Sequence, residues 1–127
     1  MAKKILIVDD DEALVVPLKE GLESAGYRVA VAFDGLQGIL QAHQMRPDVI
    51  ILDFHMPGGG GQSVYERLRK AADTASTPII FSTGDTIEEL KGRIQPTVNT
   101  FFLKKPVGLS QIVAVLNDML GEKRKAL

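Results

Sequence analysis

Four charged residues stand at or just beyond the ends of short apolar runs, and together they could carry out phosphoryl chemistry. They are Asp9, Asp10, Asp53 and Lys105. A buried strand that ends on a charged residue brings it to the edge of a sheet, where ligands bind in open α/β folds. Two carboxylates about 4 Å apart repel by about 4 kcal/mol at an effective dielectric of ~20, so three together need protonation or a cation. Oxygen ligands of this kind favour Mg²⁺, which also takes phosphate oxygens readily.

The ends of the same apolar runs also offer a nucleophile and two side chains that could bind phosphoryl oxygens. A carboxylate beside Mg²⁺ can attack phosphorus and form an aspartyl-phosphate. Thr83 follows the apolar run Ile79–Ser82, so its hydroxyl could bond a phosphoryl oxygen, and Gly84 leaves space beside it. A cis peptide bond before Pro106 would aim Lys105 into the site.

Short apolar runs alternate with longer amphipathic stretches along the chain. Most of the runs are β-branched and apolar on both faces, which is typical of parallel strands covered by helices. Strands are predicted at Lys4–Val8, Arg28–Ala32, Val49–Leu52, Ile79–Ser82 and Thr100–Leu103. Helices are predicted at about Glu12–Ala25, Gly35–Met45, Gln62–Ala72, Thr86–Ile94 and Leu109–Leu120. A strand and a helix repeated five times predict an α/β three-layer sandwich with right-handed crossovers.

Several residues should shape the ends and loops of these helices. Asp11 and Glu12 are predicted to be first-turn acids of the first helix, and Pro17 should kink that helix. The run Gly58–Gly61 predicts a flexible loop, with the third helix beginning just beyond it. Gly108 stands where an acidic or hydroxyl helix cap is common, which should slightly weaken the start of the last helix.

The composition is that of one ordinary globular domain. The 127 residues are 45% hydrophobic and 24% charged, with a net charge of −1 and no cysteine, which excludes disulfides and thiolate chemistry. The near-neutral charge argues against nucleic-acid binding, and no apolar run approaches the ~20 residues of a membrane span. The start Met1–Ile5 leaves no room for a signal peptide, and Lys123–Lys125 should be a short, solvated basic tail. We therefore expect a cytoplasmic domain with its core at about residues 3–120.

Five segments of the chain occur in a recognisable order and spacing. They are Ile5–Glu12, Pro47–Asp53, Met56–Pro57 followed by Gly61, Pro78–Gly84, and Lys104–Pro106. On these segments the chain resembles the receiver domains of bacterial response regulators, the CheY-like family. The resemblance implies a doubly wound, flavodoxin-like (βα)5 fold whose five-stranded parallel sheet has the order 2-1-3-4-5. It also implies that residues 1–127 form a single receiver domain of a two-component signal transduction system.

The resemblance assigns a role to each acid of the pocket. Asp53 would accept the phosphoryl group. Asp10 and Asp53 would bind Mg²⁺ directly, Asp9 would act largely through a metal-bound water, and the main-chain carbonyl of His55 would be a further ligand. The side chain of His55 would lie next to the path of an attacking water and could change the dephosphorylation rate in either direction.

The resemblance also implies a switch and its partners. Thr83 and Lys105 would hold the phosphoryl oxygens, and Phe102 occupies the family's aromatic switch position, although an aromatic residue there can also be plain core packing. Phosphorylation would reshape the face formed by the fourth helix, the fifth strand and the fifth helix, which would bind an output domain or protein. The donor would be a sensor histidine kinase or a phosphotransfer protein. The domain itself would be a monomer or weak homodimer that binds neither nucleic acid nor membrane, and would be no enzyme beyond its own phosphorylation and dephosphorylation.

Two other functions remain open. A haloacid-dehalogenase-type phosphatase also uses a strand-end aspartate with Mg²⁺; here Asp9 would be the nucleophile and Asp53 a bystander. Asp9 and Asp11 fit the paired-aspartate motif of that class, but Ala13 stands where a threonine or valine is expected. A degenerate receiver would bind partners without phosphorylation, but its usual mark is the loss of an acid or of the lysine, and all of these are present.

Overall fold

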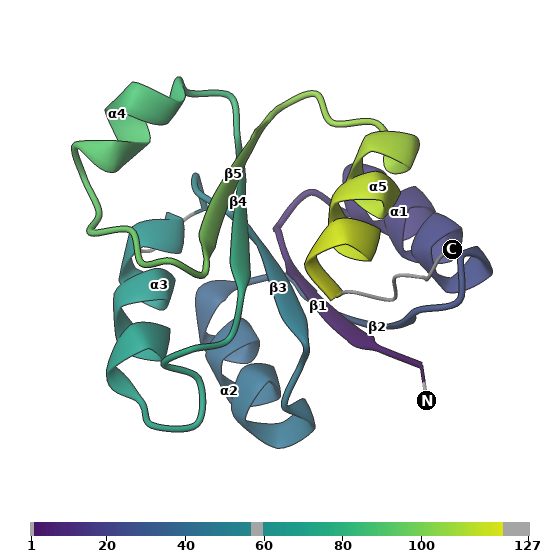
Figure 1. Cartoon of the computed structure of the whole chain (residues 1–127), viewed down its shortest axis with the longest axis horizontal. Helices are drawn as coiled ribbons and strands as arrows, with labels where there is room; N and C mark the ends of the chain where they lie inside the picture. Colours follow the sequence, from purple (N-terminus) through teal and green to yellow (C-terminus); the bar gives the residue numbers. More distant parts are fainter. Residues whose placement is uncertain (1, 57–59, 121–127) are drawn as a thin grey trace.

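A five-stranded parallel sheet carries helices on both of its faces (Figure 1). The computed structural model describes residues 2–56 and 60–120. The strands are β1 (Lys4–Val8), β2 (Arg28–Ala32), β3 (Val49–Asp53), β4 (Ile79–Thr83) and β5 (Thr100–Lys104). The helices are α1 (Glu12–Ser24), α2 (Gly35–Met45), α3 (Gly60–Lys70), α4 (Ile87–Lys91) and α5 (Leu109–Leu120). Pro57, the first two residues of the run Gly58–Gly61 and the basic tail Lys123–Lys125 lie outside the described residues.

The strand order is β2-β1-β3-β4-β5, and all neighbouring pairs are parallel. This confirms the predicted doubly wound α/β fold and its strand order. β1 and β3 pair as far as Val8 opposite Leu52, and β4 and β5 pair as far as Thr83 opposite Lys104. The residues that end or follow these four strands therefore lie along one edge of the sheet.

Side chains alternate along the strands between two separate hydrophobic cores. Leu6 and Ile50 point into the core shared with α2, α3 and α4, whereas Ile7 and Ile51 point into the core shared with α1 and α5. Figure 1 shows α1 and α5 together on one side of the sheet, with α2 and α3 on the other. Every residue of β3 is buried. Burial on both faces explains why the strands are near-continuous apolar runs instead of alternating ones.

Three strands extend one residue further than predicted. Asp53, Thr83 and Lys104 each pair within the sheet, opposite a residue of the neighbouring strand. Ladder hydrogen bonds use backbone groups, so a polar side chain at the strand end does not interrupt them. The polar residues of the edge are therefore held by the sheet itself.

α4 is shorter than the predicted stretch of residues 86–94. Thr86 caps it: the Thr86 side chain accepts a hydrogen bond from the Glu89 amide, and the Glu89 carboxylate accepts one from the Thr86 amide. Within the helix only Leu90 is buried. Most of the stability of a helix in a protein comes from packing of its apolar face, and α4 has little such packing. This accounts for its early end.

α3 begins inside the glycine run, at Gly60, so the prediction that it starts beyond the run is wrong. The amide of Gly61 donates to the carbonyl of Phe54 at 2.8 Å. A Cβ atom on Gly61 would lie 2.4 Å from the carbonyl oxygen of Asp53. Gly61 therefore lets the start of α3 pack directly against the end of β3, which is a packing role and not one of loop flexibility.

α1 runs unbroken from Glu12 to Ser24 through Pro17. Asp11 lies just outside it as the N-cap, and its carboxylate accepts from the Leu14 amide at 3.3 Å. Glu12 is the first-turn acid that was predicted. Among the described residues, no helix is both long enough and apolar enough to cross a membrane.

Candidate functional site

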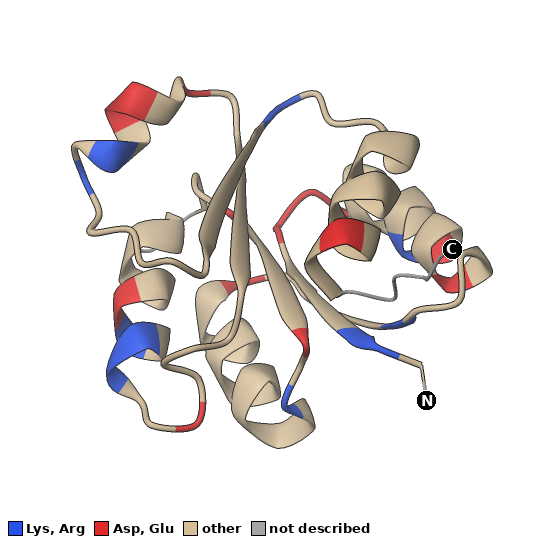
Figure 2. Cartoon of the chain, in the orientation of Figure 1, with Lys and Arg blue, Asp and Glu red and all other residues tan. Residues whose placement is uncertain are grey.

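The three predicted acids come together at the carboxyl ends of the strands. Asp9 and Asp10 directly follow β1, and Asp53 is the last residue of β3. One carboxylate oxygen from each lies within 4.8 Å of the other two. Asp9 and Asp53 are only 5% and 6% exposed, whereas Asp10 is exposed. Figure 2 shows acidic segments where β1 and β3 end and a basic segment where β5 ends.

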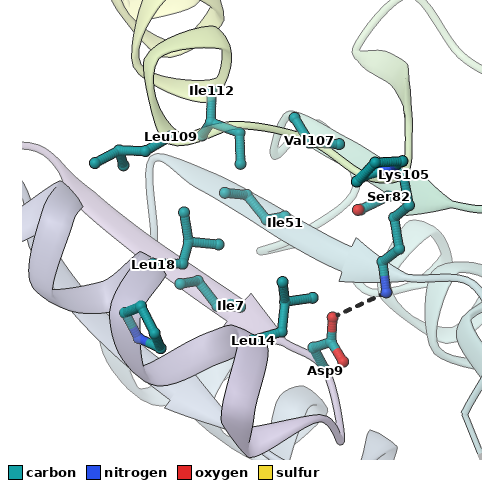
Figure 3. A pocket seen from close by; sticks show the side chains of 12 residues that line it. Ile7, Asp9, Leu14, Leu18, Ile51, Ser82, Lys105, Val107, Leu109 and Ile112 are labelled. Carbon is teal, nitrogen blue, oxygen red and sulfur yellow. Dashed lines mark hydrogen bonds and ion pairs between the residues drawn. The ribbon is translucent and has the colours of Figure 1, made fainter.

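Lys105 reaches into this acidic pocket from the end of β5. Its Nζ atom lies 3.3 Å from Asp9 Oδ2 and 3.3 Å from Asp53 Oδ1, and Figure 3 shows the contact with Asp9. The backbone amide of Lys105 donates to the carbonyl of Thr83 at 2.7 Å, which fixes the chain beside β4. The peptide bond between Lys105 and Pro106 is cis, as predicted. One ammonium group is thus shared between two buried carboxylates.

The charges in the pocket shift each other's protonation. Burial, followed by the charge of Asp9, raises the pKa of Asp53 above its ordinary value, and Lys105 only partly opposes this. Burial alone would lower the pKa of Lys105, but the attraction of Asp53 and Asp9 outweighs burial, so that pKa is raised. Lys105 is therefore charged, while Asp53 remains short of positive partners.

The donor set of the pocket fits Mg²⁺. All three side chains offer carboxylate oxygen, the ligand that Mg²⁺ prefers, and no soft sulfur or imidazole atom belongs to the cluster. Asp10 is exposed, which leaves one side open for the waters that Mg²⁺ keeps. Burial, followed by the charge of Asp9, raises the pKa of Asp53, and a cation would offset the repulsion between the two carboxylates.

Thr83 lies at the end of β4 with its side chain buried at 1% exposure. Its Oγ1 atom accepts a hydrogen bond from the Asp85 amide at 3.0 Å. The hydroxyl proton is not committed by this bond, because Thr83 is the acceptor. Thr83 thus holds the loop that follows β4 and keeps a donor for a further acceptor.

Phe102 packs on the core and is partly exposed in β5. Its ring stacks on Phe81, with 5.9 Å between centroids and 16° between planes. Phe81 in turn contacts the rings of Phe54 and Tyr65. Phe102 is therefore one end of an aromatic cluster that reaches the residue after Asp53. Core packing is shown, and the switch role stays a prediction.

His55 lies in the loop after β3 and is joined to a residue that the sequence reasoning did not single out. Its amide donates to Asp53 Oδ1 at 3.3 Å, and its Nε2 atom lies 2.6 Å from Asp85 Oδ2. The two partners are 30 residues apart in sequence. The available signal was spacing: Asp85 stands two residues after Thr83, as His55 stands two residues after Asp53.

An apolar groove of about 590 Å³ opens beside the pocket, between α1 and α5 (Figure 3). Aliphatic side chains form most of its wall, among them Leu18 of α1 and Ile112 of α5. Asp9, Ser82 and Lys105 are its polar lining residues. The acidic pocket is therefore bordered by a hydrophobic surface on the α1 and α5 face of the sheet.

Comparisons with known proteins agree with this geometry. The family model described as "Response regulator receiver domain" matches residues 5–117. The structure is similar to the chemotaxis protein CheY4 of Vibrio cholerae, with a TM-score of 0.86, 30% identity, and coverage of 94% of this chain and 99% of that one. It is also similar to the receiver domain of a Pseudomonas aeruginosa sensor histidine kinase, solved with a magnesium ion coordinated in the active site cleft. That match has a TM-score of 0.84 at 27% identity and covers 95% of this chain and 99% of the other.

Curated relatives include proteins of two lengths. The chain is 34% identical to Protein PilH of Pseudomonas aeruginosa over 93% of this chain and 98% of that protein. It is 35% identical to the DNA-binding dual master transcriptional regulator RpaA of Synechocystis over 92% of this chain. The chain spans about half the length of RpaA and of several similar regulators. These matches favour a receiver over a phosphatase of the haloacid-dehalogenase type. The chain belongs to the response regulator receiver domain family of two-component signalling.

Proposed function

We propose that Asp53 accepts a phosphoryl group in this receiver, which acts as one domain over residues 1–127 in the cytoplasm. The observation that carries the proposal is the position of Asp53 at the end of β3, beside two other acids and 3.3 Å from Lys105. A carboxylate oxygen of Asp53 would form a bond to phosphorus while the bond from phosphorus to the donor histidine breaks. The donor would be a sensor histidine kinase or a phosphotransfer protein.

Asp10 and Asp53 would hold Mg²⁺ directly, Asp9 would act through a metal-bound water, and the main-chain carbonyl of His55 would complete the protein ligands. The similar receiver domain solved with magnesium in its cleft and the cluster of three carboxylates support Mg²⁺ as the ion bound here. When bound, the ion offsets negative charge on the transferring phosphoryl group. Among the residues themselves, Lys105 favours the ionised form of Asp53, which is the form that can attack.

Thr83 and Lys105 would bind the phosphoryl oxygens. Lys105 already lies within reach of Asp53, and the Thr83 hydroxyl keeps a proton to donate. Charge-assisted hydrogen bonds to a phosphoryl group are among the strong ones in proteins. Both residues would therefore favour the arrangement in which Asp53 is phosphorylated.

A change in the position of Thr83 would change the position of the Phe102 ring. This would alter the shape of the face formed by α4, β5 and α5. A phosphoryl group shifts such an equilibrium only by its different interaction with the two states. Moving the populations from 1:99 to 99:1 takes about 5.5 kcal/mol. The changed face would bind an output domain or protein, and the domain would be a monomer or weak homodimer.

Intact-mass measurement after incubation with Mg²⁺ and acetyl phosphate tests the proposal. Wild type should gain one phosphoryl group, with acetate as the leaving group, and the gain should require Mg²⁺. Asp53→Asn should show no gain. Asp118→Asn, which changes an exposed aspartate of α5, is the matched control and should behave as wild type. A gain that survives in Asp53→Asn and disappears in Asp9→Asn would contradict the proposal.

A further inference from the structure

The contact between His55 and Asp85 joins the loop that follows β3 to the loop that follows β4, next to the acidic pocket. The Nε2 to Oδ2 distance is 2.6 Å, with the side chains 58% and 29% exposed. A carboxylate only accepts hydrogen bonds, so Nε2 carries the proton in this contact. Because the loops follow β3 and β4, the contact ties the backbone next to Asp53 to the backbone next to Thr83.

Asp85 is attached to the pocket at a second point. Its amide donates to the Thr83 hydroxyl oxygen at 3.0 Å, while its carboxylate accepts from His55. The amide of His55 donates to Asp53 Oδ1 at 3.3 Å. Each partner is thus bonded to one residue of the site through its backbone and to the other partner through its side chain.

This arrangement opposes movement of one loop relative to the other. In the proposed function Thr83 would donate its free hydroxyl proton to a group on Asp53, and Asp85 is held to the same oxygen atom through its amide. If the β4–α4 loop moves with Thr83, the Asp85 carboxylate moves relative to His55. A hydrogen bond formed in only one of two states shifts the population toward that state.

We infer that Asp85 is a positioning residue, and that its contact with His55 is a clasp that stabilises the unphosphorylated arrangement of the two loops. This inference rests on the proposed function of Asp53. Breaking the clasp should shift the unphosphorylated domain toward the arrangement that it adopts when Asp53 is phosphorylated. A hydrogen bond of this kind typically contributes about 0.5–1.5 kcal/mol, which corresponds to roughly a three- to tenfold change in the equilibrium.

The molecule contains a matched control at the other end of the sheet. His43 Nδ1 of α2 lies 2.7 Å from Asp73 Oδ2 in the α3–β4 loop. This pair also joins a histidine to an aspartate 30 residues away, but it lies at the amino ends of the strands. Substitution of His43 or Asp73 should therefore not affect the binding of a phosphoryl mimic at Asp53.

Beryllofluoride with saturating Mg²⁺ serves as the phosphoryl mimic, titrated while NMR reports the state of the domain. Asp85→Ala removes the carboxylate and keeps the amide that bonds Thr83, and His55→Gln keeps the main-chain carbonyl of His55. Both should lower the half-saturating beryllofluoride concentration roughly three- to tenfold. The double variant should match the single ones, because both remove one contact. Asp85→Asn, whose amide oxygen can still accept, should restore most of the wild-type value, and His43→Gln and Asp73→Ala should leave it unchanged.

Imidazole ¹⁵N shifts of the resting domain provide a second readout. The Nε2–H form of His55 should predominate in wild type and Asp85→Asn but mix with the other tautomer in Asp85→Ala. Saturation by beryllofluoride with no difference between wild type and Asp85→Ala would overturn the clasp and leave the proposed function intact. Mixed tautomers in resting wild type would also overturn the clasp. Failure of wild type to respond to beryllofluoride would overturn both proposals.

Discussion

Arg69 and Asp48, at the amino ends of the strands, bind backbone groups, whereas Asp9, Asp53 and Lys105 at the carboxyl ends face one another. Arg69 donates from Nη1 to the carbonyls of Thr74 and Thr77 and from Nη2 to the carbonyl of Asn99, at 3.2, 2.7 and 3.2 Å. Asp48 accepts from the Lys4 amide at 2.7 Å. Arg69 thus joins the loops before β4 and β5, and Asp48 joins the start of β3 to the start of β1.

At the carboxyl ends, two buried carboxylates share one lysine. Asp9 and Asp53 are buried and both depend on Lys105. Burial, followed by the charge of Asp9, raises the pKa of Asp53, and Lys105 offsets this only in part. This clustering of negative charge lowers the stability of the metal-free domain. It therefore favours binding of a cation, alone or together with a phosphoryl group. Charge at the amino edge therefore holds backbone segments together, whereas charge at the carboxyl edge is gathered in a cluster that suits a cation.

The largest expected difference between the edges concerns two lysines. Lys105→Ala removes the ammonium group beside Asp53, and phosphoryl uptake from acetyl phosphate should slow by about 10²–10³-fold, the usual cost of removing one donor to a developing charge. Lys4→Ala removes an ammonium that donates to the Met45 carbonyl at the opposite edge, and uptake should stay at the wild-type rate. Time courses of intact mass measure both. Equal rates for Lys105→Ala and wild type would show that Lys105 takes no part in phosphoryl uptake.

Arg69→Ala should lower the stability of the domain and leave phosphoryl uptake unchanged. It removes three hydrogen bonds to partly buried carbonyls. The carbonyls of Thr74 and Asn99 keep the backbone amides of Thr77 and Ile79 as donors, so the free energy of unfolding should fall by about 1–3 kcal/mol. Urea unfolding followed by circular dichroism measures the change. Phosphoryl uptake should persist wherever the variant is folded. A variant as stable as wild type would show that the amino edge does not depend on this residue.

Asp53→Asn should stabilise the metal-free domain near neutral pH, which is the smallest of these effects. Burial and the charge of Asp9 raise the pKa of Asp53 above its ordinary 3.8. A carboxyl with a raised folded pKa contributes most stability below its unfolded pKa and loses that contribution as pH rises through the folded pKa. The variant never becomes charged, so its advantage should be present above the folded pKa and disappear toward pH ~3.8.

Urea unfolding of both proteins at several pH values tests this sign. Adding Mg²⁺ near neutral pH should stabilise wild type more than Asp53→Asn, because an ion that binds only the folded state raises its stability. An advantage of the variant that grows as pH falls would show that the pKa of Asp53 is lowered instead of raised.

The sequence predicted the layout of the carboxyl edge because that layout follows from local patterns. A buried strand that ends on an acid places the acid at the edge whatever the rest of the chain does, so Asp9 and Asp53 could be located without coordinates. Lys105 followed from the same rule at the end of β5. The strand order itself came from the family resemblance, since periodicity does not say which strands are neighbours.

The sequence did not predict contacts between distant segments. The role of Arg69 depends on the loops before β4 and β5 arriving within reach of its guanidinium group. The contact of His55 with Asp85 likewise spans 30 residues. Gly61 looked like part of a flexible loop because nothing local shows that the backbone of Asp53 passes 2.4 Å from where its Cβ would stand. These features are properties of packing and become visible only in three dimensions.

The most direct test of the central claim is to locate the phosphoryl group within the chain. Wild type incubated with Mg²⁺ and acetyl phosphate can be reduced with borohydride, which converts an aspartyl-phosphate to homoserine, and then digested and sequenced by mass spectrometry. We expect homoserine at position 53 and unmodified aspartate at positions 9 and 10. Homoserine at position 9 with Asp53 intact would contradict it, because the nucleophile would then belong to the end of β1.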